Sequence, residues 1–108
     1  MMKCIKALVS ARDCEKQIGN HFMERTSRKL LSLMKDHEEQ YTEIYCTRVF
    51  TYHGHIICAV DDVNQLVYLT HAGWFTSSTN RALNDYRTHF VSLGYENVWH
   101  TKIYAYEK

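Results

Sequence analysis

Hydrophobic and polar positions change their spacing several times along the chain, and each change marks an expected element. Residues 3–9 combine apolar and β-branched side chains, which favours a first strand. Ser10 then stands three residues before Asp13, an arrangement that is typical of a helix start. Apolar side chains recur at helical spacing through residues 14–34, so we expect one long helix there, or two helices separated near Gly19.

The middle of the chain has the composition of a half-buried sheet, rich in Thr, Tyr, Ile, Val and Phe. A glycine at position 54 and a polar run at 61–65 divide this region with turn-forming residues. The expected order is a strand over 41–52, a turn at 53–54, a strand over 55–60, a turn over 61–65 and a strand over 66–70. These segments predict a three-stranded antiparallel meander.

A second helix is expected after the meander. Several hydroxyl side chains over 76–79 offer N-caps, and Gly94 is placed to end the helix. Leu83, Tyr86 and Phe90 fall on one helical face and are expected to point into the core.

Residues 98–106 return to strand composition and complete the predicted fold. We expect an α+β protein in which an antiparallel sheet of three to five strands carries two helices, packed mainly on one face. A length of 108 residues, with 45% hydrophobic and 23% charged side chains, predicts a single domain over residues 1–108.

Charge, hydropathy and cysteine content indicate the location of the protein in the cell rather than its function. The net charge is +1, from 13 basic and 12 acidic residues, so total charge identifies no partner. No apolar run approaches the roughly 18 residues of a membrane helix, and we expect no membrane partner. The four cysteines are widely spaced, which favours reduced thiols and a cytoplasmic location.

The densest group of potential metal ligands lies around the predicted 53–54 turn, but its spacing does not match that of structural zinc sites. A two-residue turn pairs Cys58 with Val49 and puts Cys46 on the opposite face of the hairpin. A three-residue turn puts both thiols on one face but roughly 13 Å apart. We therefore expect no metal and no cofactor at Cys46, His53, His55 and Cys58.

Catalytic signatures are missing from the sequence. It contains no Gly-x-Gly-x-x-Gly, phosphate-loop, His-Glu-x-x-His or Gly-x-Ser-x-Gly motif. The pair Asp61 and Asp62 could hold a cation, although adjacent acids after a strand are more often turn residues. We expect a protein that is not an enzyme, with an uncharacterised enzyme kept as an alternative.

The outer face of the second helix and the aromatic residues before it form the predicted partner surface. With the apolar stripe turned inward, the opposite side displays amides and guanidinium groups beside two large aromatic rings. The predicted partner-binding residues are Trp74, Phe75, Asn80, Arg81, Asn84 and Arg87.

Other interpretations of this surface stay open. A nucleic-acid-binding module that uses the helix around residues 78–93 would need the same donors. An ordinary solvated face would instead pair Arg81 with Asp85 and pack Phe75 into the core. A tyrosine-rich sheet face is a further candidate surface, with the side chains of Tyr45, Tyr68, Tyr104 and Tyr106.

Four segments between Arg48 and Phe90 carry a likeness to known proteins: Tyr52-His-Gly54, Leu66-Val-Tyr68-Leu-Thr70, Trp74-Phe-Thr-Ser-Ser-Thr79 and Asn80-Arg-Ala-Leu-Asn84. In these segments the chain resembles a family of small tailed-bacteriophage proteins of unassigned function. The resemblance implies a phage origin and a location in the cytoplasm of a bacterial host. It leads us to expect a small non-enzymatic protein that binds and inhibits a host protein or nucleoprotein complex, for example in anti-CRISPR or anti-restriction defence.

Overall fold

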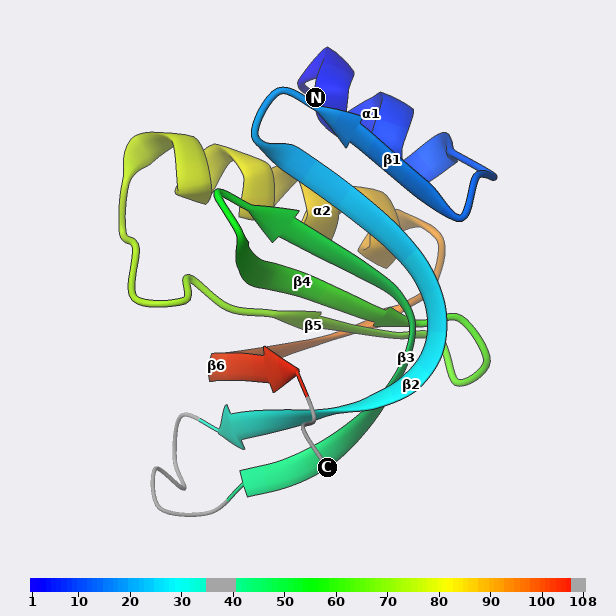
Figure 1. The fold of residues 1–108 in the computed structure, drawn as a ribbon, viewed down its shortest axis with the longest axis vertical. Coiled ribbons are helices and arrows are strands. Elements are labelled where there is room, and N and C mark those ends of the chain that lie inside the picture. Colours follow the sequence, from blue (N-terminus) through cyan, green and yellow to red (C-terminus); the bar gives the residue numbers. More distant parts are fainter. Residues whose placement is uncertain (35–40, 106–108) are drawn as a thin grey trace.

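The computed structural model describes residues 1–34 and 41–105. Figure 1 shows both helices on the same side of a strongly curved sheet, with β1 beside α1. Along the described residues the elements are α1 (Lys3–Ser10), β1 (Glu15–Ile18), β2 (His21–Met34), β3 (Tyr41–Tyr52), β4 (His55–Asp61), β5 (Leu66–Leu69), α2 (Ser77–Ser92) and β6 (Glu96–Ala105).

The first element is a helix, so the strand predicted over residues 3–9 is wrong. Ile5, Leu8 and Val9 fall at i, i+3 and i+4 and are buried together on one side of α1. The β-branched residues of this segment favour a strand, but its apolar residues have helical spacing. In so short an element, packing of one apolar face against the rest of the protein decides the structure, and here it favours the helix.

The helix predicted over residues 14–34 is also wrong, because this segment forms the antiparallel hairpin of β1 and β2. Gly19 adopts a positive φ of 61° in the turn between them. The buried residues of β2 are His21 and Met23 near the start but Leu30 and Ser32 near the end, and Met23 and Leu30 belong to two different clusters of buried side chains. A bulge between Arg25 and Arg28 separates these two groups, and it breaks the two-residue alternation that marks a strand.

The predicted meander is confirmed. Strands β3, β4 and β5 are antiparallel neighbours, and Tyr52 pairs with His55 across a two-residue turn. His53 and Gly54 have φ values of 51° and 79°, the positive values that two-residue hairpin turns of the common type require.

The sheet has six strands rather than three to five, and it is mixed rather than purely antiparallel. Strands β5 and β6 are parallel because α2 lies in the connection between them and returns the chain to the same end of the sheet. The last part of β6 then pairs antiparallel with the second half of β2. The strands from β2 to β6 therefore form a closed ring of pairings, and β1 extends from the first half of β2.

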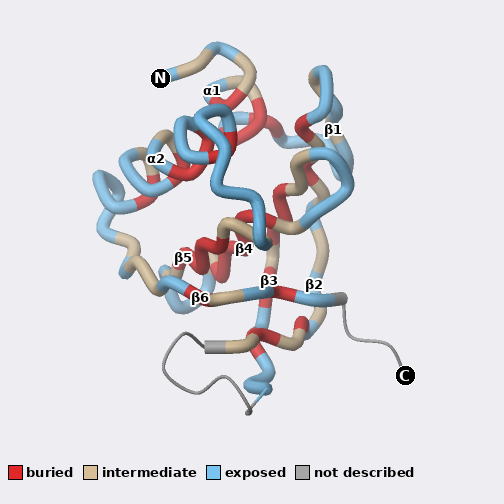
Figure 2. The backbone as a smooth tube through the Cα atoms, turned by 90° about the vertical axis from the view of Figure 1, so that its left-hand side faces the viewer, coloured by how far each residue is buried: buried red, intermediate tan, exposed pale blue. Residues whose placement is uncertain are grey.

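A curved, closed sheet has an outer and an inner face, and each face has its own cluster of buried side chains. The outer cluster joins both helices to the sheet and contains Ile5, Leu8, Val9, Ala11, Met23, Phe50, Ile57, Cys58, Val60, Val67, Leu69, Ala82, Leu83, Tyr86 and Phe90. The inner cluster contains Leu30, Ile44, Cys46, Val49, Ala59, Tyr68 and Ile103. Figure 2 shows the buried positions in the middle of the molecule and exposed positions along the connecting segments. Both helices of the structure therefore pack on one face, as predicted for two helices, although only α2 is a helix that the sequence predicted and α1 lies where a strand was expected.

Candidate functional site

Helix α2 presents the predicted polar face to solvent. Its N-cap is Thr76, whose side chain accepts a hydrogen bond from the Thr79 amide at 3.3 Å. The predicted inward residues Leu83, Tyr86 and Phe90 are buried, as expected. The opposite side of the helix is exposed at Asn80, Arg81, Asn84 and Arg87.

The segment between β5 and α2 holds two aromatic rings outside the core. The buried Thr70 side chain donates a hydrogen bond to the Thr101 carbonyl at 2.7 Å and accepts one from the Ala72 amide at 3.1 Å. Ala72 and Gly73 then both adopt positive φ, 53° and 84°, which turns the chain sharply. The next two residues are left exposed, Trp74 at 53% and Phe75 at 75%. Phe75 therefore does not pack into the core.

Three stacked rings form what we call the aromatic face, defined by His71, Phe75 and Trp99. The His71 ring lies 4.6 Å from that of Phe75 and 5.5 Å from that of Trp99, with interplanar angles of 23° and 13°. Its Nε2 atom lies 2.8 Å from Oδ1 of Asn80, so α2 holds the middle ring in place. Trp99 itself is 39% exposed. The stack is thus fixed by a turn, a helix and a strand.

Two hollows flank the aromatic face and share His71 and Trp99. One of about 370 Å³ is bordered by the α2 side chains Asn84 and Arg87 and by Asn97 of β6. Arg87 also donates a hydrogen bond to Oδ1 of Asn84 at 3.1 Å. The other hollow, of about 540 Å³, reaches past Phe75 to Lys102. None of the residues that line these two hollows carries a carboxylate, so the surroundings of the stack favour an acidic or hydrogen-bond-accepting partner.

The structure brings together Phe75, Asn80, Asn84 and Arg87 of the predicted surface, but not the other two residues. Trp74 points to the other side of the 71–76 segment, where its ring lies 5.5 Å from that of His55. Arg81 lies beside the chain start, in a hollow that also includes Met2 and Asp85.

The Asp85 carboxylate accepts a hydrogen bond from the Met2 amide at 2.9 Å. Among the ion pairs of residues 1–34 and 41–105, none joins this carboxylate to Arg81.

Sequence reasoning missed His71 and Trp99. Trp99 reaches the stack because β6 runs parallel to β5, with Leu69 opposite Trp99. That pairing is long-range and has no local sequence signal. Of the tyrosine-rich alternative, Tyr45 and Tyr104 are exposed, Tyr68 is buried, and Tyr106 lies outside the described residues.

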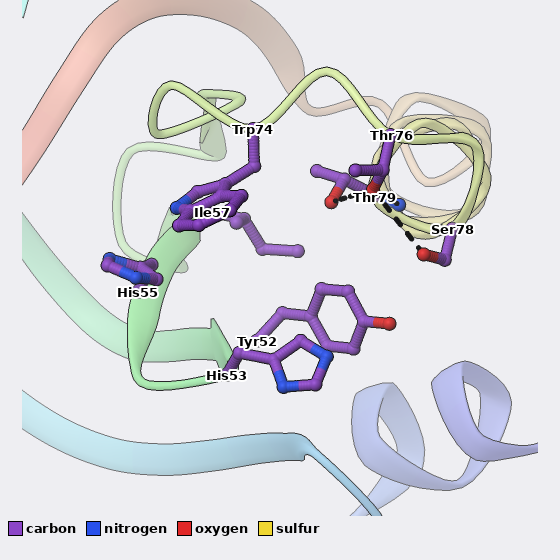
Figure 3. A pocket seen from close by; sticks show the side chains of 8 residues that line it. All are labelled: Tyr52, His53, His55, Ile57, Trp74, Thr76, Ser78 and Thr79. Atoms are coloured by element: carbon purple, nitrogen blue, oxygen red, sulfur yellow. Dashed lines mark hydrogen bonds between the residues drawn. The ribbon is translucent and has the colours of Figure 1, made fainter.

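A separate cavity of about 510 Å³ lies between the β3–β4 turn and the start of α2, and we call it the hairpin cavity (Figure 3). Its lining residues come from two segments of the chain, 52–57 and 74–79: Tyr52, His53, His55, Ile57, Trp74, Thr76, Ser78 and Thr79. Behind it, the His21 ring stacks on Tyr52 at 4.2 Å. Burial, together with the charge of His53, lowers the pKa of His21, so that ring is neutral near pH 7.

The four potential metal ligands around the 53–54 turn do not converge. A bulge between Phe50 and Thr51 pairs Cys58 with Phe50 rather than with Val49. The two thiols still separate as expected, with Cys46 in the inner cluster and Cys58 in the outer cluster. Within the described part of the chain, no three His, Cys, Asp or Glu side chains are placed to share a metal ion. Burial raises the pKa of Cys46 to about 12 and that of Cys58 well above its usual value, so both thiols are protonated.

The acidic pair after β4 is engaged in local structure. Oδ1 of Asp61 accepts hydrogen bonds from the Val63 and Asn64 amides at 3.0 Å each, as a turn residue does. The Asp62 carboxylate accepts hydrogen bonds from Arg48 and Tyr95. The carboxylate oxygens of Asp61 and Asp62 are therefore engaged in this turn and in the ion pair with Arg48.

Comparison with known proteins adds no identification: no family model matches the chain, and neither a curated protein nor a solved structure does. Over residues 1–34 and 41–105, neither helix has the length and apolar character that crossing a bilayer requires.

Proposed function

We propose that this chain is a non-enzymatic binding protein that contacts a protein partner through the aromatic face and the neighbouring side of α2. The observation that carries the proposal is the exposed stack of His71, Phe75 and Trp99, next to Arg87. Aromatic rings and arginine carry most of the energy of protein interfaces when a partner buries them.

The aromatic face is preorganised, which lowers the entropy lost on binding. The Thr70 hydrogen bonds fix the turn that presents Phe75, and Asn80 holds the ring of His71. Side chains of Asn84, Arg87 and Asn97 surround the stack with hydrogen-bonding groups, as the polar rim of an interface does. The partner surface should therefore be flat or convex, with carboxylates or carbonyl groups around an apolar centre.

The proposed partner is a bacterial host protein or nucleoprotein complex, and the proposed effect is inhibition in the host cytoplasm. The resemblance of residues 48–90 to tailed-phage proteins supports this setting. A small protein without its own chemistry can inhibit by covering a surface that a larger complex needs.

The experiment that tests the proposal is capture of partners from bacterial lysate by the tagged chain, followed by affinity measurement with the captured component. The double variant Phe75→Ala, Arg87→Glu should keep its fold, because both side chains are exposed. It should weaken binding about tenfold or more through loss of a central ring and reversal of a charge. Val63→Ala, at an exposed position in the turn between β4 and β5, is the control and should bind like the parent.

If the folded double variant bound the partner with the affinity of the parent, the aromatic face would not be the binding surface.

Single-stranded nucleic acid is the second candidate for this face. Exposed rings beside Arg87 and Lys102, with no carboxylate in either hollow, also suit stacked bases and phosphates. Fluorescence anisotropy with a labelled oligonucleotide discriminates the two functions. Affinity for nucleic acid should fall steeply with added salt, whereas affinity for a protein partner held mainly by aromatic contacts should fall much less.

A further inference from the structure

We propose that the hairpin cavity is a separate binding site for the base of a small nucleoside or nucleotide. The cavity lies on the opposite side of the 71–76 segment from the aromatic face, and its lining includes none of His71, Phe75 or Trp99. The proposal is therefore independent of the protein-binding function. Its volume of about 510 Å³ is within the range of roughly 300 to 1,000 Å³ that is usual for small-molecule pockets.

The apolar walls of the cavity are mainly aromatic. Figure 3 shows the rings of Trp74 and Tyr52 on different sides of the open space, with Ile57 behind it. Trp74 is 53% exposed and belongs to neither buried cluster, so the core does not account for its position. The exposed indole of Trp74 favours a planar ring, because aromatic surfaces stack on the faces of bases, and Tyr52 closes the space on another side.

The rim of the cavity carries hydrogen-bonding groups that a purely apolar ring would leave without partners. In Figure 3 the dashed bonds join only hydroxyl groups and the backbone at the start of α2, and neither His53 nor His55 is bonded to another residue drawn. Ser78 contacts the Thr76 hydroxyl at a long 3.4 Å and is exposed, so its hydroxyl remains able to bond a ligand. Imidazoles and hydroxyls both donate and accept, which matches the mixed donors and acceptors on a base edge.

The walls are held by local structure on both sides. The Tyr52 ring stacks on that of His21 at 4.2 Å and contacts that of His53 at 4.3 Å with a tilt of 49°. On the other side, the Thr76 hydroxyl is fixed by the Thr79 amide and lies 2.9 Å from the Thr79 hydroxyl. The cavity is thus formed before a ligand arrives, as small-molecule sites usually are.

The chemistry of the lining also excludes some ligands. None of the lining residues carries a carboxylate, so the cavity has no anionic ligand for a metal ion or an amine. The same lining tolerates a phosphate attached to the sugar, since the two imidazoles and the hydroxyls can donate to it. The base, which nucleosides and nucleotides have in common, is therefore the group that the cavity is proposed to bind.

The test is an amide-resolved NMR titration of the whole chain with adenosine, cytidine, adenosine monophosphate and inorganic phosphate in separate arms. We expect saturable shifts from a nucleoside that cluster at residues 52–57 and 74–79, with inorganic phosphate alone producing none there. Stronger binding of the monophosphate than of adenosine would identify a nucleotide as the ligand, and equal binding would identify a nucleoside. Both results support the site.

Neighbouring residues provide matched variants. Trp74→Ala should weaken nucleoside binding at least about fivefold, the lower end of base–aromatic stacking, and Trp74→Phe should retain most of it. Phe75→Ala should bind the nucleoside like the parent, although it removes a ring of the aromatic face. These variants separate failure of this site from failure of the proposed function.

Three results would overturn the proposal: no saturable shifts with any nucleoside or nucleotide, shifts with phosphate and the monophosphate but not with nucleosides, or unchanged affinity in folded Trp74→Ala.

Discussion

Arg48 joins four parts of the molecule through one buried guanidinium group. It is 8% exposed, and two of its nitrogens donate to the Asp62 carboxylate at 3.0 and 2.6 Å. A third nitrogen donates to the Val9 carbonyl near the end of α1 at 3.1 Å. The guanidinium carbon lies 5.0 Å from the ring centre of Phe90 in α2. Because one side chain serves both helices, β3 and the turn after β4, this ion pair contributes to stability rather than to binding.

The charge of Asp62 should make stability depend on acid pH. Burial alone would raise its pKa, but hydrogen bonds from Arg48, Thr47 and Tyr95 and the charge of Arg48 outweigh burial and lower the pKa to about 2. A carboxyl with a folded pKa below its unfolded pKa of 3.8 contributes stability that is present above pH 4 and lost as the pH falls towards 2.

We therefore expect Asp62→Asn to lower the free energy of unfolding at pH 7 by about 2 to 4 kcal/mol, since it leaves Arg48 buried without its counter-charge. Urea denaturation of the variant and the parent should show this difference narrowing between pH 4 and pH 2. Asp13→Asn, at an exposed carboxylate, is the control and should change stability by less than about 0.5 kcal/mol. A difference that is the same at every pH would contradict the assigned role of this ion pair.

At the scale of elements, the sequence was informative where one local signal dominated. The Gly54 turn and the flanking β-branched runs predicted the meander, and the hydroxyl-rich cap with its apolar stripe predicted α2. The segment 14–34 misled because both faces of β2 carry apolar side chains. Phe22, Leu31 and Leu33 are partly buried, and the bulge between Arg25 and Arg28 interrupts the strand alternation, so the apolar positions imitate helical spacing.

Some residues of the candidate site could be predicted from local sequence signals, and others could not. Asn80, Asn84 and Arg87 could be predicted because an amphipathic helix fixes which of its sides faces solvent. His71 and Trp99 could not, because their meeting depends on the parallel β5–β6 pairing across the whole of α2. The separation of Trp74 from Phe75 depends on two positive φ angles in the preceding turn, one of them at the non-glycine Ala72.

Phe90 should be the residue that holds α2 on the sheet. It is fully buried, and its ring lies 6.1 Å from that of Phe50 and 5.3 Å from that of Tyr95. Phe90→Ala should lower the free energy of unfolding by about 3 to 5 kcal/mol, the usual result of removing a buried aromatic ring.

Chemical denaturation is the measurement. Val91→Ala, at the next position and 46% exposed, should shift the unfolding free energy by less than about 0.5 kcal/mol. Equal midpoints for Phe90→Ala and the parent would show that α2 is not anchored in this way.

At the scale of the whole molecule, the closed ring of strands couples the two buried clusters. Neighbouring residues of β3 and β4 point to opposite faces, so Val49 and Ala59 enter the inner cluster while Phe50 and Cys58 enter the outer cluster. The inner cluster also needs Leu30 and Ile103, which the β2–β6 pairing brings together. Neither cluster can be exposed without breaking strands that support the other, and we therefore expect cooperative unfolding of one domain.

The two buried cysteines report on this coupling, because Cys46 lies in the inner cluster and Cys58 in the outer cluster. A thiol reagent should modify the exposed Cys14 quickly and both buried thiols only through global unfolding. Modification of the two buried thiols should therefore be roughly a thousandfold or more slower than that of Cys14, for an unfolding free energy of about 5 kcal/mol or more.

Cys46 and Cys58 should also react at equal rates, measured by mass spectrometry of the labelled peptides. Chain fully unfolded in guanidinium, where all thiols are accessible, calibrates their intrinsic reactivity. Faster modification of Cys46 than of Cys58 without denaturant would show that the inner cluster opens by itself. The two clusters would then not unfold as one cooperative unit.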